Sequence, residues 1–412
     1  MSGEFSLTQT MIPLNSNLIK SLAKGLHGIE RESLRINLDG SLALSPHPKA
    51  LGSPLNNPNL TTDFSESQLE LITNPLSSLK ATLEELELWH KKTAHSLGDE
   101  RMWPFSMPCV LPDADKIPIA QFGDSPEGKA KSLYREGLAF RYGKAMQTIC
   151  GVHYNYSFDE EVCTHLPGTK EERMMGMMRN FIRIRWVLTY LLGASPVKHE
   201  SYSCNKMKEC GKDAVSLRLS RCGYSNPAKI DVSFNDYQSQ IRDIKKALET
   251  PHEDYFGHGL NSNLLQIPAE YYFSIRLKPI LGPLEYVEVR MVDVDPFQPT
   301  GVNPQAMYFL HLVLTDCLLR ESPPLSKEEL EKSTQKQQWV ALYGQSTQAK
   351  DLKEIEAFIK SLEPLAQALG KEYVDSLTMQ PPWKKILKAL EEKSFIELGL
   401  ELAEKHHNFL LS

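Results

Sequence analysis

The sequence predicts an α+β protein with one larger domain, residues 1–325, and a helical C-terminal region, residues 326–412, packed on it. Apolar and polar residues alternate in residues 152–158, which is the period of a β-strand. Residues 171–193 instead carry apolar residues at spacings of three and four, as amphipathic helices do. After residue 326 the helical spacing continues without a strand signal. These observations together predict the mixed class and the helical end.

The individual elements follow in chain order. Residues 28–44 predict a hairpin, because an alternating segment is followed by Asp39 and Gly40, a turn dipeptide, and then by a second alternating segment. A proline-rich loop is expected at residues 103–128. Extended segments are also expected at 62–73, 152–158, 213–220, 270–278 and 284–292, and helices at 76–97, 129–148, 171–193, 235–249 and 303–321.

Composition and charge exclude several classes of partner. The chain has 412 residues with 46 Lys and Arg against 52 Asp and Glu, which gives a net charge of −6. This balance leaves no basic excess for wrapping nucleic acid or holding an anionic membrane. The longest apolar run, Trp186–Ala194, is far shorter than the ~20 residues that a membrane span needs. No signal peptide is expected at the N-terminus, so a cytoplasmic location is predicted.

The cysteines predict a reducing compartment. The chain has 7 of them, an odd and small number for its length, and they are scattered. Cys204, Cys210 and Cys222 lie near one another in sequence, but no CxxC pair occurs. Ordinary thiols are therefore expected there, with a metal site as the alternative.

The polar faces of the predicted strands indicate a binding site. Because side chains alternate across a strand, Tyr286, Glu288 and Arg290 share one face, and His153 and Asn155 share one face of another strand. A solvent-facing sheet also alternates in this way, but its polar face would carry interchangeable Lys, Glu and Thr. Acids, a histidine, arginines and tyrosines are more typical of a ligand-binding concavity.

Five acidic residues on such segments are candidates for a metal site. If they converge, each pair of carboxylates at ~5 Å repels by roughly 3 kcal/mol at an effective dielectric constant of 20. The site must then raise their pKa values or bind cations. Oxygen ligands with one imidazole suit Mg²⁺ or Mn²⁺ better than zinc, and His153 is the imidazole candidate unless it is an ordinary core histidine. The acids are Glu30, Glu32, Asp63, Glu70 and Glu288.

Arginines in the same segments favour phosphoryl transfer. Bound metals bridge phosphate oxygens, and guanidinium groups meet the charge spread over the moving phosphoryl group. Arg135, Arg218, Arg276 and Arg290 are the candidates. Residues 123–130 nearly match a phosphate-binding loop, but they lack the Ser or Thr that ligates Mg²⁺. A turn and helix cap is therefore the preferred interpretation of that segment.

The chain resembles the glutamate–cysteine ligase family, in the class typical of gamma-proteobacteria. The resemblance runs from about Gly28 to Val302 through GIERESLR, TTDFSESQLELIT, GDERMWPFSMPC, LYREGLAFRYG, MQTICGVHYNYSF, SLRLSRCGY, NSNLLQI and EYVEVR. It implies a fold similar to glutamine synthetase, in which antiparallel strands curve into a half-barrel with helices outside. It also implies that ATP and Mg²⁺, with Mn²⁺ as an alternative, activate the γ-carboxylate of glutamate for attack by the amine of cysteine, the first step of glutathione biosynthesis. Small molecules would then be its only partners, and a monomer is expected.

The resemblance also implies roles for the residues of these motifs. The metal ligands would be Glu30, Glu32, Asp63, Glu70, His153 and Glu288, and the catalytic residues would be Arg135, Arg290 and Glu288. Glutamate would be bound by Gln147, Ile149, Asn155 and Arg218, cysteine by Tyr134, Tyr224 and Tyr272, and the nucleotide phosphates by Arg276 and Lys278.

Two alternatives remain open from the sequence. The first keeps ATP-dependent ligation but changes the acceptor amine, because residues 201–212 depart from the family pattern. The second is a binding or regulatory protein with an inactive site, because the C-terminal part is short compared with the family. The segment between Lys278 and Leu284 is also short, which concerns the affinity for ATP. The complete set of acids argues against the second, since an inactive site is free to lose them.

Overall fold

The computed structural model describes residues 11–203, 212–226 and 228–412. Within these residues a seven-stranded sheet runs in the order β2-β3-β1-β5-β7-β6, with β4 paired to β1. Every pairing is antiparallel. The strands are β1 (Leu26–Ile36), β2 (Leu60–Thr62), β3 (Gln68–Ile72), β4 (Arg101–Met102), β5 (Val152–Ser157), β6 (Ile275–Lys278) and β7 (Tyr286–Val292).

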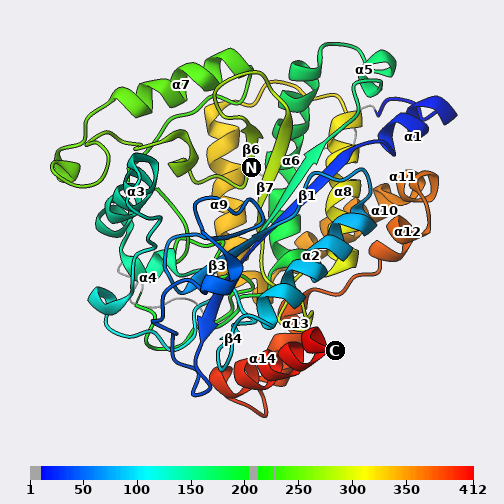
Figure 1. Ribbon diagram of the computed structural model, residues 1–412. Helices are drawn as coiled ribbons and strands as arrows, with labels where there is room; N and C mark the ends of the chain where they lie inside the picture. The colour runs from blue at the N-terminus through cyan, green and yellow to red at the C-terminus, as the bar shows by residue number, and fades with distance from the viewer. Residues whose placement is uncertain (1–10, 204–211, 227) are drawn as a thin grey trace.

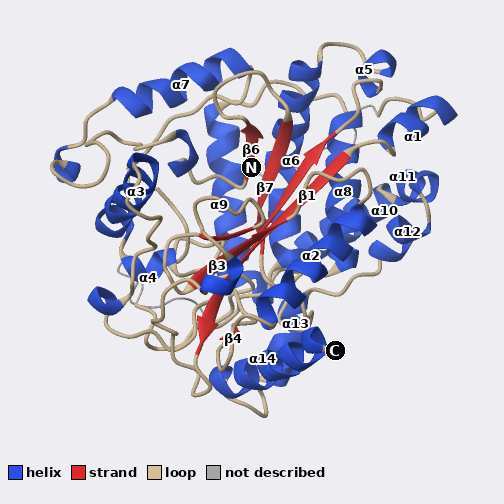
Figure 2. Ribbon diagram, in the orientation of Figure 1, coloured by secondary structure: helices blue, strands red, loops and turns tan. Residues whose placement is uncertain are grey.

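Helices surround this sheet, which crosses the middle of the molecule (Figure 1, Figure 2). Helix α6 packs on β6 and β7, α2 packs on β1 and β3, and α8 packs on α6. The α-helices are α1 (Ser16–Leu22), α2 (Leu79–Ala94), α3 (Pro126–Tyr142), α4 (Lys144–Gln147), α5 (Val162–His165), α6 (Lys170–Leu192), α7 (Tyr237–Glu249), α8 (Pro304–Leu319), α9 (Lys327–Tyr343), α10 (Ala349–Ser361), α11 (Glu363–Leu369), α12 (Lys371–Ser376), α13 (Pro382–Ala389) and α14 (Phe395–Leu411).

The alternation of residues along the strands sorts the two faces of the sheet. Ile29, Tyr154 and Val289 are fully buried and lie beside one another on neighbouring strands. The core on this face therefore fixes the register, because a slip by one residue would turn the acids and His153 into this apolar core. The same register brings His153 beside Glu30 on the opposite face.

Several expected elements differ from the structure. Residues 213–220 contain no strand, because they form turns whose one β-bridge, between Ser195 and Ser216, is isolated. Only residues 275–278 of the strand expected at 270–278 are paired in the sheet. The helix expected at 129–148 is two helices, since Gly143 has a φ of 83° that interrupts the helical path.

The two extended N-terminal segments also differ in detail. The turn at Asp39 and Gly40 is present, but the return of the expected hairpin pairs only through a bridge between Ile36 and Leu42. Residues 62–73 are not one extended segment, because β2 and β3 are antiparallel partners within 60–72. This second hairpin brings the end of β2 to the acidic side of the sheet.

The C-terminal helices pack against the larger part of the chain. Helix α9 lies along α6, where the Ser333 hydroxyl donates to the carbonyl of Ile182. Helix α14 approaches the ring of Trp103 so closely that a Cβ at Gly399 would lie 2.1 Å from the ring. The helical character expected after residue 326 is confirmed, whereas the division into domains at that residue stays a prediction.

The cysteines are free at four described positions, Cys109, Cys150, Cys163 and Cys317. Cys222 is disulfide-bonded, so the expectation of a free thiol is wrong at that position. Cys204 and Cys210 lie outside the described residues.

Candidate active site

The acids and the histidine converge because neighbouring strands carry them at matching register positions. Glu32 on β1 is paired with Glu70 on β3, and Glu30 on β1 is paired with His153 on β5. On the far side of β5, Glu288 of β7 follows as the partner of Asn155. A register shift between β5 and β7 near His153 gives β7 an additional residue there, and such a bulge redirects side chains locally.

Five of the six expected ligands form two overlapping groups around one imidazole. Glu30, His153 and Glu288 offer atoms within 4.8 Å of one another, and Glu32, Glu70 and His153 do the same. His153 Nδ1 lies 2.9 Å from Glu30 Oε2, and its Nε2 lies 3.5 Å from Glu32 Oε1. The imidazole therefore has one ring nitrogen toward each group.

Asp63, the sixth expected ligand, lies outside both groups. It follows the last residue of β2, and its backbone carbonyl accepts a hydrogen bond from Nε of Arg135. Its carboxyl group is nevertheless close enough to the others to raise the pKa of Glu32 and Glu70. Asp63 thus belongs to the electrostatics of the site.

The carboxyls on the β1 and β3 side resist ionisation. Burial, and then the charge of Asp63, raise the pKa of Glu32 to about 8. The same two causes, together with Glu30 and Glu32, raise the pKa of Glu70 well above its usual value, and burial raises that of Asp63. Protons or bound cations must therefore neutralise this group of acids.

Glu288 is ionised because three cations surround it. Its Oε2 is 2.7 Å from Nε of Arg276 and 3.5 Å from Nζ of Lys278, and its Oε1 is 3.0 Å from Nη1 of Arg290. Burial opposes ionisation, but Arg276 and Arg290 outweigh it and hold the pKa of Glu288 well below its usual range. Burial likewise opposes ionisation of Glu30, whose pKa is lowered by its hydrogen bond with His153.

The donor set fits a divalent cation with a preference for oxygen ligands. Burial, and then Arg290, lower the pKa of His153 to about 4, so the imidazole is neutral at physiological pH. A neutral imidazole can donate a lone pair to a metal, and buried carboxylates supply the hard oxygens that Mg²⁺ and Mn²⁺ prefer.

Arg218 reaches the site from a loop rather than from the expected strand. Its Nη2 donates to the carbonyl of Arg290 at 2.8 Å, and its Nη1 lies 3.5 Å from Oδ1 of Asp293. A Cβ at Gly151 would lie 1.9 Å from the guanidinium, so only glycine leaves room for it. Gly151 also donates its backbone N–H to Glu32 at 2.7 Å. Neither Gly151 nor Asp293 was among the expected residues.

The expected tyrosines surround one end of the site. The rings of Tyr224 and Tyr272 lie 5.3 Å apart, and Gln147 donates to the Tyr272 hydroxyl. The Tyr224 hydroxyl donates to the carbonyl of Ile149 at 3.0 Å. Burial raises the pKa of Tyr134 well above its usual value, so this phenol stays protonated. These side chains are hydrogen-bond donors and apolar walls, not bases.

Asn155 and Arg135 lie beside different acids, Glu30 and Asp63. Asn155 Nδ2 donates to Oε1 of Glu30 at 2.8 Å. The guanidinium of Arg135 lies 4.2 Å from the centre of the Phe122 ring and has no carboxylate within ion-pair distance in the described chain. The guanidinium of Arg135 can therefore pair with an anionic group of a substrate at the edge of the site.

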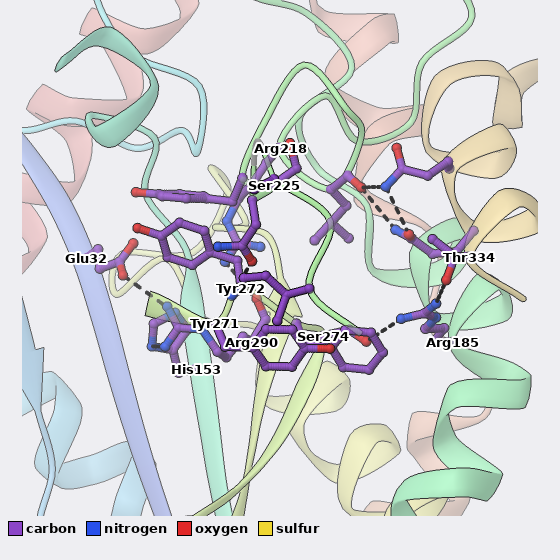
Figure 3. A pocket seen from close by; sticks show the side chains of 18 residues that line it. Glu32, His153, Arg185, Arg218, Ser225, Tyr271, Tyr272, Ser274, Arg290 and Thr334 are labelled. Carbon is purple, nitrogen blue, oxygen red and sulfur yellow. Dashed lines mark hydrogen bonds and ion pairs between the residues drawn. The ribbon is translucent and has the colours of Figure 1, made fainter. Parts of the chain in front are cut away.

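A cavity of about 290 Å³ opens from these groups. Figure 3 shows Glu32 and His153 at one end, Arg290 and Tyr272 in the middle, and Arg185 with Thr334 at the other end. Arg218 and Tyr224 also line it. Sequence patterns do not indicate Arg185, Ser274 and Thr334, because these residues converge from α6, the loop before β6 and α9.

Two negative expectations can be compared with the structure. Residues 123–130 form a turn and the start of α3, where Ser125 accepts a hydrogen bond from the backbone of Gly128. The preferred interpretation of this segment as a turn and cap is confirmed. Among the described residues, every helix is too short or too polar to cross a membrane.

Known proteins resemble the chain over most of its length. A family model described as glutamate-cysteine ligase matches residues 13–340. A glutamate–cysteine ligase from Alcanivorax borkumensis is 35% identical, over 97% of this chain and 90% of the relative. One from Clostridium acetobutylicum is 37% identical, over 82% of this chain and 81% of the relative.

Solved structures agree with the sequence comparison. A glutamate–cysteine ligase from Francisella tularensis in complex with AMP matches with a TM-score of 0.88 and 31% identity, over 94% of this chain and 89% of the other. A bifunctional glutathione synthetase from Pasteurella multocida matches with a TM-score of 0.83 and 26% identity, over 96% of this chain and 54% of the other. The expected fold, an antiparallel sheet of the glutamine synthetase kind with helices around it, is confirmed.

Proposed function

The chain belongs to the glutamate–cysteine ligase family, and on this premise we propose that it joins the γ-carboxylate of L-glutamate to the amine of L-cysteine at the expense of ATP. The γ-carboxylate is first phosphorylated to γ-glutamyl phosphate, and the amine then displaces phosphate to give γ-glutamylcysteine. The AMP bound to the Francisella relative supports the use of a nucleotide.

One observation carries the proposal: two carboxylate–imidazole groups and a set of arginines meet on one polar face of the sheet. A carboxylate is a poor acceptor for an amine because its oxygen leaves badly, and phosphorylation provides a better leaving group. Transfer of a phosphoryl group mainly requires positioning and compensation of charge, which these side chains supply.

The metal ligands of this proposal are Glu30, Glu32, Glu70, His153 and Glu288, and Asp63 adds negative charge beside them. Magnesium, or manganese in its place, supplies positive charge to the phosphate oxygens when bound. Within the protein, Arg290 is held by Glu288 and lies 3.3 Å from His153, which aims its guanidinium at the same region. We assign Arg290 and Arg135 to the transferring phosphoryl group, and Arg276 and Lys278 to the other phosphates.

Glutamate and the acceptor occupy the cavity beside these groups. We assign the backbone carboxylate and amine of glutamate to Arg218, Asn155, Gln147 and Ile149. Tyr224 and Tyr272 line the cavity next to Arg290, and they form the acceptor pocket together with Tyr134. These half-buried rings form apolar walls that limit the access of water, which would otherwise hydrolyse the acyl phosphate.

A coupled assay of ADP release with glutamate, with and without cysteine, tests the proposal. Product must require glutamate, and cysteine must increase its rate. Glu288→Gln should lower kcat at least about 100-fold, because it uncouples three cations from the site. Glu285→Gln, an exposed neighbour outside the site, is the matched control and should retain wild-type activity. Absence of glutamate-dependent ADP release in the wild type would refute the proposal and favour an inactive binding protein.

The acceptor is tested separately because different amines fit the same chemistry. A panel of amino acids at fixed glutamate should give the highest kcat/KM for cysteine. Another amine that exceeds cysteine tenfold or more would leave the ligation intact and change the substrate. The cytoplasmic location and the monomeric state stay predictions.

A further inference from the structure

Arg185 is a buried cation without a counter-ion. Its side chain lines the cavity from α6, and the residue is only 3% exposed. Nη1 donates to the Ser274 hydroxyl at 3.0 Å and Nη2 to the Thr334 hydroxyl at 2.6 Å, whereas Nε has no hydrogen-bond partner. In residues 11–203, 212–226 and 228–412, no carboxylate lies within ion-pair distance of this guanidinium.

Most other buried arginines of the described chain have a carboxylate partner. Arg35, Arg141, Arg218 and Arg276 each have a carboxylate within 4.0 Å. Arg31 lacks one, but it borders a cavity of only about 10 Å³, which holds no more than a water molecule. Arg185 alone combines a missing counter-ion with a cavity of ligand size, within the part of the chain that the structure describes.

The surroundings of Arg185 hold its guanidinium in place without neutralising it. The Phe273 ring lies 4.8 Å from Cζ, and Thr334 is itself anchored by a hydrogen bond to the carbonyl of Leu330. Burial lowers the pKa of Arg185 to about 10, so the guanidinium remains charged at neutral pH although no carboxylate of the described chain pairs with it. The guanidinium has five N–H groups, and only two have acceptors. Nη1 and Nη2 each keep one further N–H without an acceptor in the described chain, and these two are available to a carboxylate.

We infer that Arg185 and the Ser274 hydroxyl form a carboxylate-binding subsite at the end of the cavity opposite Glu32 and His153 (Figure 3). Thr334 is a positioning residue for it. The Ser274 hydroxyl accepts from Arg185 and has no other partner in the described chain, so its proton is available to a ligand oxygen. The backbone of Ser274 accepts from Arg290 at 2.9 Å, which joins the subsite to the reaction centre.

The carboxylate can come from two sources. The first is the acceptor amino acid, and this assignment rests on the proposed function. Arg218 is assigned to glutamate, and the remaining cations are assigned to phosphates. The carboxylate of the acceptor is thus the one substrate anion without a cation, and Arg185 is the cavity cation without an anion. The second source is a separate small carboxylate that binds beside the substrates.

Arg185→Met tests the subsite through substrate analogues. Cysteamine has the amine and thiol of cysteine but no carboxylate. If the acceptor is the source, the substitution should raise the KM of cysteine at least about tenfold and leave the KM of cysteamine unchanged. Ser274→Ala should shift the KM of cysteine in the same direction by a smaller factor. Arg183→Met, two residues away on the same helix and outside the cavity lining, is the matched control and should change neither KM.

Acetate distinguishes the second source and requires no activity. If a separate carboxylate binds, acetate should raise the thermal midpoint of the wild type and of Arg183→Met but not that of Arg185→Met. The inference is overturned if the KM values of cysteine and cysteamine change by the same factor and acetate has no selective effect. A wild type that lacks ligase activity refutes the proposed function alone, because the acetate titration still tests the subsite. Ser274→Ala provides the same readouts if Arg185→Met does not fold.

Discussion

Mg²⁺ should bind the candidate site more tightly as the pH rises, because a cation must replace a proton on Glu32. Burial and the neighbouring Asp63 raise the pKa of Glu32 to about 8. A carboxyl group that is protonated cannot ligate, so the apparent association constant for Mg²⁺ is proportional to the fraction of Glu32 that is ionised.

The size of this effect follows from the pKa. With a pKa of about 8, roughly one tenth of Glu32 is ionised at pH 7 and about three quarters at pH 8.5. Glu32 alone should therefore strengthen Mg²⁺ binding about eightfold between these two pH values, which corresponds to ~1.2 kcal/mol. Glu70 has a pKa raised in the same direction and adds to the effect.

Isothermal titration calorimetry with Mg²⁺ measures both the affinity and the released protons. Repeating the titration in buffers of different ionisation enthalpy should reveal proton release on binding at pH 7. Glu32→Gln removes the titrating group and should flatten the part of the pH dependence that Glu32 contributes. An affinity that is constant from pH 7 to 8.5, or a slope that is equal in wild type and Glu32→Gln, would refute the reasoning.

Three further predictions concern catalysis and stability. Arg290→Ala should lower kcat by a factor of about 10²–10³ with a smaller effect on the KM of glutamate, since it acts on the transferring group; initial rates that show only a change in KM would contradict this role. Tyr224→Phe removes the hydroxyl that donates to Ile149 and should raise only the KM of cysteine, by about tenfold at most, in the same assay. Burial lowers the pKa of His27 to about 4, so the unfolded state binds more protons below pH 6.5 and stability falls as the pH decreases toward 4. Urea unfolding at pH 7 and 4.5 should show that His27→Gln loses about 2.5 kcal/mol less over this interval than the wild type; equal losses would exclude the contribution.

The sequence predicts those parts of the fold in which local periodicity reflects long-range packing. Residues 152–158 and 284–292 alternate because one face of each strand is in the core, and both strands are present as β5 and β7. Residues 213–220 alternate for a different reason. Val215 and Leu217 are buried in a loop between Ser195 and the carbonyl of Ala341, so the pattern reports burial without a strand. Periodicity alone cannot separate these cases.

The site shows the same limit. The acids could be predicted because each lies in a motif on a strand or strand end. Arg185 could not, because its hydroxyl partners lie 89 and 149 residues away in sequence and come from a loop and another helix. Asp293 follows β7 and lies beside Arg218, which comes from a distant loop. Its role in positioning Arg218 is therefore visible only in the folded structure.

The arrangement of charges across the sheet divides the acids into two kinds. β6 and β7 carry Arg276, Lys278 and Arg290, so Glu288 is ionised before any metal binds. β1 and β3 carry no cation on the same face near Glu32 and Glu70, and both pKa values are raised. His153 lies between the two kinds and contacts Glu30 on one side and Glu32 on the other. The Glu288 side is therefore prepared to bind a cation without losing a proton, whereas the Glu70 side must release protons when a cation binds. Metal binding by Glu32, Glu70 and His153 is consequently the step whose affinity depends on pH.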